Sequence, residues 1–412
     1  MPEKVSAAKL GANIARLRRK CGYTQTALAE KLYVSNKTVS KWERGAGYPE
    51  ITQLIGLAKL FGTSIENIIM GERFGIAFAG NMLTDSVKLA GCYPEKGMLA
   101  TVYSVSQAVG GCVPNTAIDL AKIDPELRIS AYGRIGNDDA ERYLIGELQR
   151  HGIDVGGVKI SSTSGTSFSD VMTVKSTGER TFFHYRGANS EFSPQDIKIS
   201  DMNCEMLHIG YILLLDEFDK SDDEYGTAMA RFLSEAQKAG IRTSIDVVSS
   251  SDGSFAEKVA PALKYTDNAI MNEIEGSGIS GLAARDENGK LIFENIKKTM
   301  RVIFDYGVSE RVILHCPEAG FCLEKDGKFT VVPSLDLPKG YIKGTVGAGD
   351  AFCAGCLYGI YNDWDAEQIL TFAAGAAACN LSAEDSVSGM KDKKTIFELA
   401  GSMKNTKIKF EE

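Results

Sequence analysis

The sequence lacks the features of a secreted or membrane-spanning protein. Its first ten residues, MPEKVSAAKL, contain no basic stretch followed by an apolar core, and no run of about 18 apolar residues occurs. The 9 cysteines are an odd number without a repeating framework, so we expect reduced thiols and no disulfide scaffold. These absences predict a cytoplasmic protein with no membrane partner.

The composition is that of a globular chain with more than one domain. The 412 residues are 44% hydrophobic and 24% charged, and they include 42 glycines. Residues 1–72 contain 11 Lys and Arg against 6 Asp and Glu, a net charge of +5, whereas the remainder contains 35 against 48, a net charge of −13. Two parts with different partners are therefore expected.

Residues 1–72 have the apolar spacing of a small all-α bundle. The spacing over 10–32 predicts two short helices, with Thr24 as the N-cap of the second. A third helix is expected at 36–43, a fourth at 50–61 after Pro49, and a fifth near 64–70. A helix, a short turn and a second helix in a basic bundle is the geometry that places one helix in the DNA major groove.

The segment QTALAEKLYVSNKTVSKWERGAGYPEITQLIGLAKLFGTSIENII resembles the lambda-repressor-like (XRE) helix-turn-helix family. The resemblance implies binding of double-stranded DNA through residues 1–72 by a homodimer, with Asn36, Lys37 and Lys41 facing base edges and Gln25 and Arg44 holding phosphates. It also places Ala29, Val34, Val39 and Leu54 in the core of the bundle. Trp42 is expected to be a packing residue. There are two alternatives to DNA binding. Lys37, Lys41 and Arg44 could form an ordinary solvated helix face, or the bundle could bind another protein.

The junction between the two parts is short. Gly71-Glu72-Arg73 leaves almost no linker before the next apolar strand. The spacing of two DNA-binding units would then depend on how the large domain dimerises, which offers a route for signalling.

From Phe74 onward, short apolar strands alternate with helices, which predicts a second domain at 74–412. Such alternation is typical of an α/β sandwich around a largely parallel sheet. Stretches at 89–108 and 166–185 have β-like composition with no helical pattern between them. They predict a small β-sheet that projects as a lid.

The strongest chemical signal is GTVGAGDAFCAGCLYGIY, residues 344–361. The small residues Gly347, Ala348 and Gly349 precede an apolar helix, so several backbone N–H groups can point at one anion beside the positive helix end. Asp350 lies in the first helical turn, from which a carboxylate can reach a bound hydroxyl. An anion hole and a proton acceptor are thus adjacent, although a lone GxGD also fits an ordinary capped helix start.

This segment resembles the signature of the ribokinase-like (PfkB) carbohydrate kinases, which the chain matches in order from about 75 to 389. The resemblance implies a three-layer α/β sandwich with a β-sheet lid, ATP and Mg²⁺ as cofactors, and a small sugar-like substrate. Asp350 becomes the catalytic base, with an anion hole of Gly347, Ala348 and Gly349. Read alone, each shorter motif below fits an ordinary turn or loop.

Further motifs supply the expected binding residues. The motif GNMLTD contains Asp85, and GGCVPN contains Gly110, Gly111 and Asn115; the resemblance implies that these four residues bind the substrate. The segment TFFHYRGAN adds Arg186 and Asn189 to the expected substrate site. RIGND (134–138) resembles another turn of the family. NEIE (272–275) provides Asn272 and Glu275, which the resemblance associates with phosphates and the outer shell of Mg²⁺. Gly320 and Thr345 complete the expected nucleotide site.

The sequence departs from the family pattern at two places. Gly344 stands where the family has an Asp linked to a monovalent-cation loop, which puts cation activation in doubt. His315-Cys316-Pro317 replaces a Thr-x-Gly pair, so His315 either contacts a phosphate or is a neutral strand-end histidine. Cys353 and Cys356 form a CxxC whose helical spacing favours core packing.

These observations leave two hypotheses for the kinase-like part, beside a third in which the N-terminal part is a protein-interaction module. The first is a working sugar kinase with a DNA-binding head, which regulates transcription in response to its own substrate. The second is a transcription regulator whose kinase-like domain binds a sugar or nucleotide without catalysis.

Overall fold

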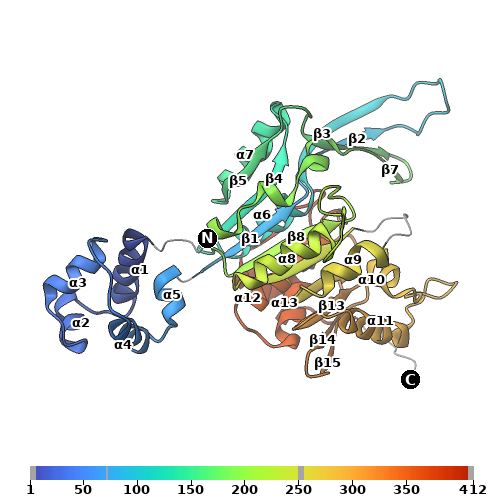
Figure 1. The fold of residues 1–412 in the computed structure, drawn as a ribbon. Coiled ribbons are helices and arrows are strands. Elements are labelled where there is room, and N and C mark those ends of the chain that lie inside the picture. The colour runs from blue at the N-terminus through green and yellow to red at the C-terminus, as the bar shows by residue number, and fades with distance from the viewer. Residues whose placement is uncertain (1–5, 71–72, 249–254, 407–412) are drawn as a thin grey trace. The chain divides into compact units, whose positions relative to one another are not determined.

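The structure, a computed structural model, describes residues 6–70, 73–248 and 255–406. The chain divides into two compact units, Met1–Phe74 and Gly75–Glu412 (Figure 1). Gly71 and Glu72 of the predicted junction lie outside the described residues.

The N-terminal unit has the five helices that the sequence predicts: α1 Ala7–Lys20, α2 Gln25–Lys31, α3 Asn36–Glu43, α4 Ile51–Phe61 and α5 Ile65–Met70. The hydroxyls of Thr24 and Ser35 cap α2 and α3 by accepting hydrogen bonds from the third backbone N–H that follows each of them. Gly62 ends α4 in the left-handed conformation, with φ of 63°.

The core of this unit lies between the helix faces. Trp42 is only 4% exposed, which confirms that it packs inside the bundle. Ala29 and Val39 are buried, and Val34 and Leu54 pack against them half-buried. Burial of this apolar face holds together helices that are too short to be stable alone.

The C-terminal unit contains a nine-stranded sheet in the order β15-β14-β13-β12-β11-β8-β1-β4-β5. Neighbouring strands are parallel except at β13-β14-β15, where they are antiparallel. The strands are β1 Ile76–Gly80, β4 Ile129–Ile135, β5 Asp154–Ile160, β8 Met206–Ile212, β11 Arg242–Val247, β12 Asn268–Asn272, β13 Arg311–His315, β14 Ala319–Glu324 and β15 Phe329–Pro333.

Helices cover both faces of this sheet. In β1, Ile76 and Phe78 belong to one buried cluster and Ala77 and Ala79 to the other, as the two-residue period of a strand requires. The first face is covered by α6 Cys112–Ile123, α7 Asp139–Arg150, α12 Ala348–Tyr361, α13 Ala366–Leu381 and α14 Lys393–Ser402. The second is covered by α8 Ala228–Lys238, α9 Phe255–Leu263, α10 Glu273–Ser280 and α11 Phe293–Asp305. The predicted three-layer α/β sandwich is confirmed.

A second sheet projects from the sandwich as the predicted lid (Figure 1). Its order is β3-β2-β6-β7, with strands β2 Leu83–Ala90, β3 Val102–Gly110, β6 Ser167–Val174 and β7 Arg180–Tyr185. Because β2 follows β1 directly and α6 begins directly after β3, both ends of this hairpin lie at the edge of the large sheet. The remaining elements are a two-stranded ribbon, β9 Ser221–Asp222 and β10 Gly226–Thr227, and three short 3₁₀ helices, Gly187–Glu191, Pro194–Asp196 and Ile199–Asp201.

Within the residues that the structure describes, no helix combines the length and apolarity that a transmembrane span needs.

Candidate active site

Asp350 lies in the first turn of α12, where it is 7% exposed and contacts two other elements. Its Oδ2 accepts a hydrogen bond of 2.9 Å from Asn115 Nδ2 of α6. The hydroxyl of Tyr211, on β8, lies 3.2 Å from Oδ1 and 3.3 Å from Oδ2. The carboxylate is therefore held in one orientation by two donors.

Burial is the largest influence on Asp350. It raises the pKa of this carboxyl, and the nearby charge of Asp246 raises it further, to about 7. The hydrogen bonds from Asn115 and Tyr211 act in the opposite direction because they stabilise the charged form. A carboxyl that titrates near neutral pH can exist as the base and can also release a proton that it has received.

The start of α12 is shaped to receive an anion. Gly347 caps the helix with φ of 76°, and an added Cβ there would lie 2.6 Å from Cβ of Ser386, so only glycine fits. Ala348 and Gly349 follow, and the first N–H groups of a helix have no acceptor within it. The Ala348 N–H makes a long contact of 3.5 Å with the carbonyl oxygen of Thr345 in the preceding loop. These amides and the positive end of the helix face the same region as Asp350.

A cavity of about 260 Å³ opens beside this helix start. Its lining comes from the C-terminal ends of parallel strands and from α12, which is where open α/β sheets bind ligands. The lining residues include Tyr211, Asp246, Asn272, Glu275, His315, Gly347, Gly349, Asp350 and Cys353. Residues separated by more than 130 positions thus share one site.

Asp85 lies on β2 of the lid sheet and, like Gly110, Gly111 and Asn115, is not among the residues that line this cavity. Burial raises its pKa to about 6, and the Ser169 side chain of the neighbouring strand lowers it slightly. An added Cβ at Gly110 would lie 2.5 Å from Asp85 Oδ2, so the glycine leaves room for this carboxylate. Gly111 caps α6 with φ of 87°. Asp85 is also close enough for its charge to raise the pKa of Asp350.

Asn272 and Glu275 form a closed pair at the start of α10. The Asn272 side chain accepts hydrogen bonds from the backbone N–H groups of Ile274 and Glu275, and its Nδ2 donates to Glu275 Oε1 at 2.7 Å. Glu275 Oε2 accepts from the Asn272 backbone N–H at 2.9 Å. Both carboxylate oxygens are thus engaged, so contact with a metal ion through water is more natural than direct ligation.

Four other predicted site residues lie elsewhere or have other partners. Asn189 is 1% exposed, and its amide accepts from Met82 N at 3.1 Å and donates to Met82 O at 2.9 Å. Each end of the amide thus holds the backbone of Met82, which gives Asn189 a structural role, while its substrate contact stays a prediction. Arg186 forms an ion pair with Asp216 at 40% exposure.

Gly320 and Thr345 are also absent from the cavity lining. Gly320 is buried in β14, where an added Cβ would lie 2.9 Å from Phe352 Cζ, so it serves the packing of α12 on the sheet. Thr345 is exposed in the loop before α12. The nucleotide contacts of these two residues stay predictions.

The two departures from the expected pattern have structural explanations. An added Cβ at Gly344 would lie 2.8 Å from the carbonyl oxygens of Ala383 and Glu384, so the fold here leaves no room for a side chain. His315 lines the cavity, packs on the Phe352 ring with centroids 4.8 Å apart, and has a pKa lowered by burial to about 4. It is therefore neutral at pH 7.

Two residues of the cavity lining, Tyr211 and Asp246, were not predicted from the sequence. Tyr211 stands at the end of β8 with φ of 62°, and its backbone N–H donates to Asp246 Oδ1 at 2.6 Å. A left-handed tyrosine is strained, and such strain often marks a functional site. The only signal was a tyrosine and an aspartate near the ends of apolar strands, which is too common to be specific.

In the N-terminal unit, α3 is the second helix of the predicted helix-turn-helix motif, and it exposes polar side chains to solvent. Asn36, Lys37, Lys41 and Arg44 are exposed on or just after α3. Gln25 is engaged within the bundle instead, since its Nε2 donates to Glu43 Oε2 at 2.6 Å.

Comparison with known proteins agrees with both halves of this description. Residues 76–393 match the model of the pfkB family carbohydrate kinases, and residues 14–68 match a helix-turn-helix model. The 5-dehydro-2-deoxygluconokinase of Geobacillus kaustophilus (strain HTA426) is 26% identical over 298 residues, which are 70% of this chain and 82% of the relative. The HTH-type transcriptional activator BcrR of Enterococcus faecalis is 42% identical over 59 residues, 14% of this chain and 29% of the relative.

Solved structures establish the fold of the larger unit. The ribokinase of Arabidopsis thaliana, complexed with ribose and ATP, superposes with a TM-score of 0.66 at 20% identity, covering 80% of this chain and 99% of that one. The ribokinase of Thermotoga maritima gives a TM-score of 0.65 at 19% identity, with 80% and 100% covered. The ribokinase-like fold is thereby shown.

Proposed function

Because this chain belongs to the pfkB family of carbohydrate kinases, we propose that it transfers the γ-phosphoryl group of ATP to a hydroxyl of a small sugar-like substrate, with Asp350 as the base. The observation that carries the proposal is the position of the Asp350 carboxylate. It lies in the first turn of α12, beside the amides of Gly347, Ala348 and Gly349 and on the wall of an open cavity.

The proton step follows from the surroundings of Asp350. In phosphoryl transfer the transition state is loose and the hydroxyl proton leaves late, so the base has to receive the proton and need not abstract it early. Asn115 and Tyr211 hold the carboxylate in place. General-base catalysis of this kind contributes typically about 10²–10⁴-fold.

The start of α12 stabilises the charge of the transferred group. The N–H groups at this helix start are fixed before the reaction, so they need no reorganisation as negative charge develops. Gly349 lacks a side chain, which lets the phosphoryl oxygens approach the backbone. His315 faces the same cavity as a neutral group that can offer one N–H donor.

The oxygen-rich wall of the cavity fits a hydrated Mg²⁺ ion. Mg²⁺ prefers oxygen ligands and keeps several waters. Glu275 and Asn272 would hold that hydration shell, since the carboxylate of Glu275 is already oriented by Asn272. When bound, the ion would neutralise charge on the phosphates of ATP.

The substrate site lies between Asp85 of the lid and Asp350. The carboxylates of Asp85, on β2, and Asp350, on α12, suit a molecule with several hydroxyls, because such a molecule can donate a hydrogen bond to each of them. Among sugar-like compounds, we place keto-sugar acids and pentoses first, because the relatives include a 5-dehydro-2-deoxygluconokinase and a ribokinase.

The N-terminal unit is proposed to bind double-stranded DNA as part of a homodimer. The exposed Lys37, Lys41 and Arg44 and the net charge of +5 over residues 1–72 support this role. The whole chain would then be a cytoplasmic kinase that also regulates transcription. The glycine at 344 and the histidine at 315 keep a second possibility open, a regulator that binds sugar without catalysis.

A coupled assay of ATP consumption over a panel of pentoses, ketoses, keto-sugar acids and nucleosides tests the proposal. We expect one substrate class to support turnover by the wild type, and Asp350→Ala to lose at least about 100-fold. Thermal-shift measurements on the same panel separate the alternatives. Ligand binding with wild type and Asp350→Ala equally inert would establish the non-catalytic sensor.

A further inference from the structure

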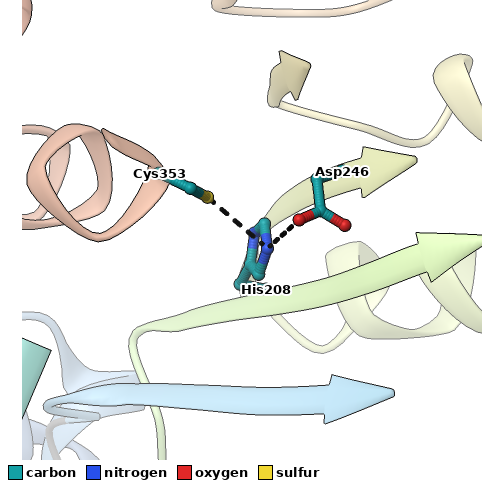
Figure 2. A group of neighbouring side chains, drawn as sticks. All are labelled: His208, Asp246 and Cys353. Atoms are coloured by element: carbon teal, nitrogen blue, oxygen red, sulfur yellow. Dashed lines mark hydrogen bonds and ion pairs between the residues drawn. The ribbon is translucent and has the colours of Figure 1, made fainter. Parts of the chain in front are cut away.

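Three buried side chains converge directly behind the start of α12. His208 comes from β8, Asp246 from the end of β11 and Cys353 from α12, and their nearest ligand atoms all lie within 4.8 Å of one another (Figure 2). Asp246 and Cys353 line the cavity, and His208 lies beneath them, 1% exposed. The group is separate from the Asn272 and Glu275 pair discussed for Mg²⁺.

The spacing of these atoms is compatible with ligands around a metal ion, and the His208–Cys353 contact is also short enough for a weak hydrogen bond to sulfur. His208 Nε2 lies 3.7 Å from Asp246 Oδ2 and 3.7 Å from Cys353 Sγ. A nitrogen-to-oxygen hydrogen bond has a length of about 2.7–3.2 Å. Ligand atoms around a tetrahedral zinc ion, with bonds of about 2.0–2.3 Å, are separated by about 3.4–3.6 Å. The two distances from the histidine need a contraction of only a few tenths of an ångström, and the ligand atoms of Asp246 and Cys353 lie within 4.8 Å of each other.

The outer contacts already orient the three groups. Ser244 Oγ lies 3.1 Å from His208 Nδ1, which leaves Nε2 to face Asp246 and Cys353. The backbone N–H of Tyr211 donates to Asp246 Oδ1, which leaves Oδ2 toward the histidine. Hydrogen bonds of this kind to the distal atoms of ligands are a usual feature of metal sites.

The charge of the region also favours a cation. Within the described part of the chain, the ion pairs give Asp246 no lysine or arginine partner. A divalent ion with one carboxylate, one thiolate and a neutral imidazole has no net charge.

We propose that His208, Asp246 and Cys353 form a binding site for one thiophilic divalent metal ion, of which Zn²⁺ is the best match. Nitrogen, sulfur and carboxylate ligands together are typical of zinc, whereas Mg²⁺ and Ca²⁺ avoid sulfur. Two of the ligands line the cavity, so the fourth coordination position faces it and is open to water or an anion. The site does not depend on the kinase activity.

Cobalt(II) substitution tests the site in the full-length protein. Metal-stripped protein is titrated with Co²⁺ in excess Mg²⁺, and the thiolate-to-Co(II) charge-transfer absorption is recorded. We expect one Co²⁺ per chain with this absorption, and its loss when Zn²⁺ is added. Cys353→Ser should abolish the absorption and weaken Co²⁺ binding at least about tenfold.

Cys356→Ser is the matched control, because Cys356 lies one turn further along the same helix and is equally buried. It should retain the absorption. Ser244→Ala provides a milder variant that keeps all three ligands and should weaken binding by about 10–100-fold, even if Cys353→Ser does not fold. The proposal is overturned if the wild type gives no charge-transfer absorption, if Cys353→Ser retains it, or if Ser244→Ala binds Co²⁺ as tightly as the wild type.

Discussion

The hydroxyl of Tyr211 reaches both carboxylate oxygens of Asp350, at 3.2 and 3.3 Å, from a backbone held in the left-handed conformation. A strained residue at the end of β8 is therefore used to direct a hydrogen bond at the proposed base. With Asn115 on the other side, the donor pair fixes where this carboxylate can accept a proton.

This contact predicts a change in pH dependence. With the pKa of Asp350 at about 7, kcat/KM should rise as the pH increases through 7, because only the ionised form accepts a proton. Tyr211→Phe removes a hydrogen bond that favours the charged form, so the acidic limb should move up by about one pH unit. Tyr361→Phe, whose hydroxyl accepts from the Gly75 backbone, is the control and should not move it.

Asp350→Asn should remove most activity and also stabilise the fold. The pKa of this carboxyl is raised from 3.8 in the unfolded chain to about 7 in the folded protein. Ionisation therefore destabilises the wild type increasingly from pH 4 to 7, by up to about 4 kcal/mol above pH 7. Urea unfolding at pH 4.5 and pH 8 should show a larger gain for the variant at pH 8. An equal gain at both pH values would contradict the raised pKa.

The two glycines at the start of α12 should respond differently to alanine. Gly347→Ala combines a positive φ with a contact of 2.6 Å to Ser386, so it should lower stability by at least about 1 kcal/mol. Gly349→Ala places its Cβ at an ordinary 3.5 Å from His315 Cε1 and should leave the melting temperature nearly unchanged. It should still reduce kcat, because the methyl group crowds the phosphoryl position. If Gly349→Ala has normal kinetics, the proposed anion hole is wrong.

Asn189→Ala tests the reassignment of Asn189 to a structural role. It leaves the buried N–H and C=O of Met82 without partners, which should cost about 2–4 kcal/mol in the free energy of unfolding. At a temperature where the variant is fully folded, KM for the sugar should change less than threefold. A large rise in KM without loss of stability would restore the substrate contact that the sequence suggested.

Lys41→Ala should weaken DNA binding by the N-terminal unit. Its side chain is exposed at the end of α3, so its loss removes the proposed contact to DNA without disturbing the core. Fluorescence anisotropy with DNA from upstream of the gene should show weaker binding, with a shallower dependence on salt if the lysine contacts a phosphate. Lys59→Ala, exposed near the end of α4, is the control. Wild-type binding that is absent or independent of salt would favour protein docking.

Several features were readable in the sequence because they depend on local chemistry. The helices of the N-terminal unit follow from apolar spacing and from caps such as Thr24 and Ser35. The start of α12, with Gly347 as its cap and Asp350 in its first turn, follows from residues 347–350, since glycine conformation and helix polarity act within a few residues. The same locality explains why the alternation of strands and helices predicted the sandwich and its lid.

Other features were decided only by the tertiary structure. Asp350 meets Tyr211 and Asn115 across more than 130 positions, and His208, Asp246 and Cys353 come from three separate elements. The sequence did not show that Asn189 would be occupied by Met82, or that Gly344 would be enclosed by the 383–384 backbone. The spacing of a motif shows only which groups lie close to one another along the chain. Burial and long-range packing decide which of those groups remain available to a ligand, and these exist only once the sheet has brought its strand ends together.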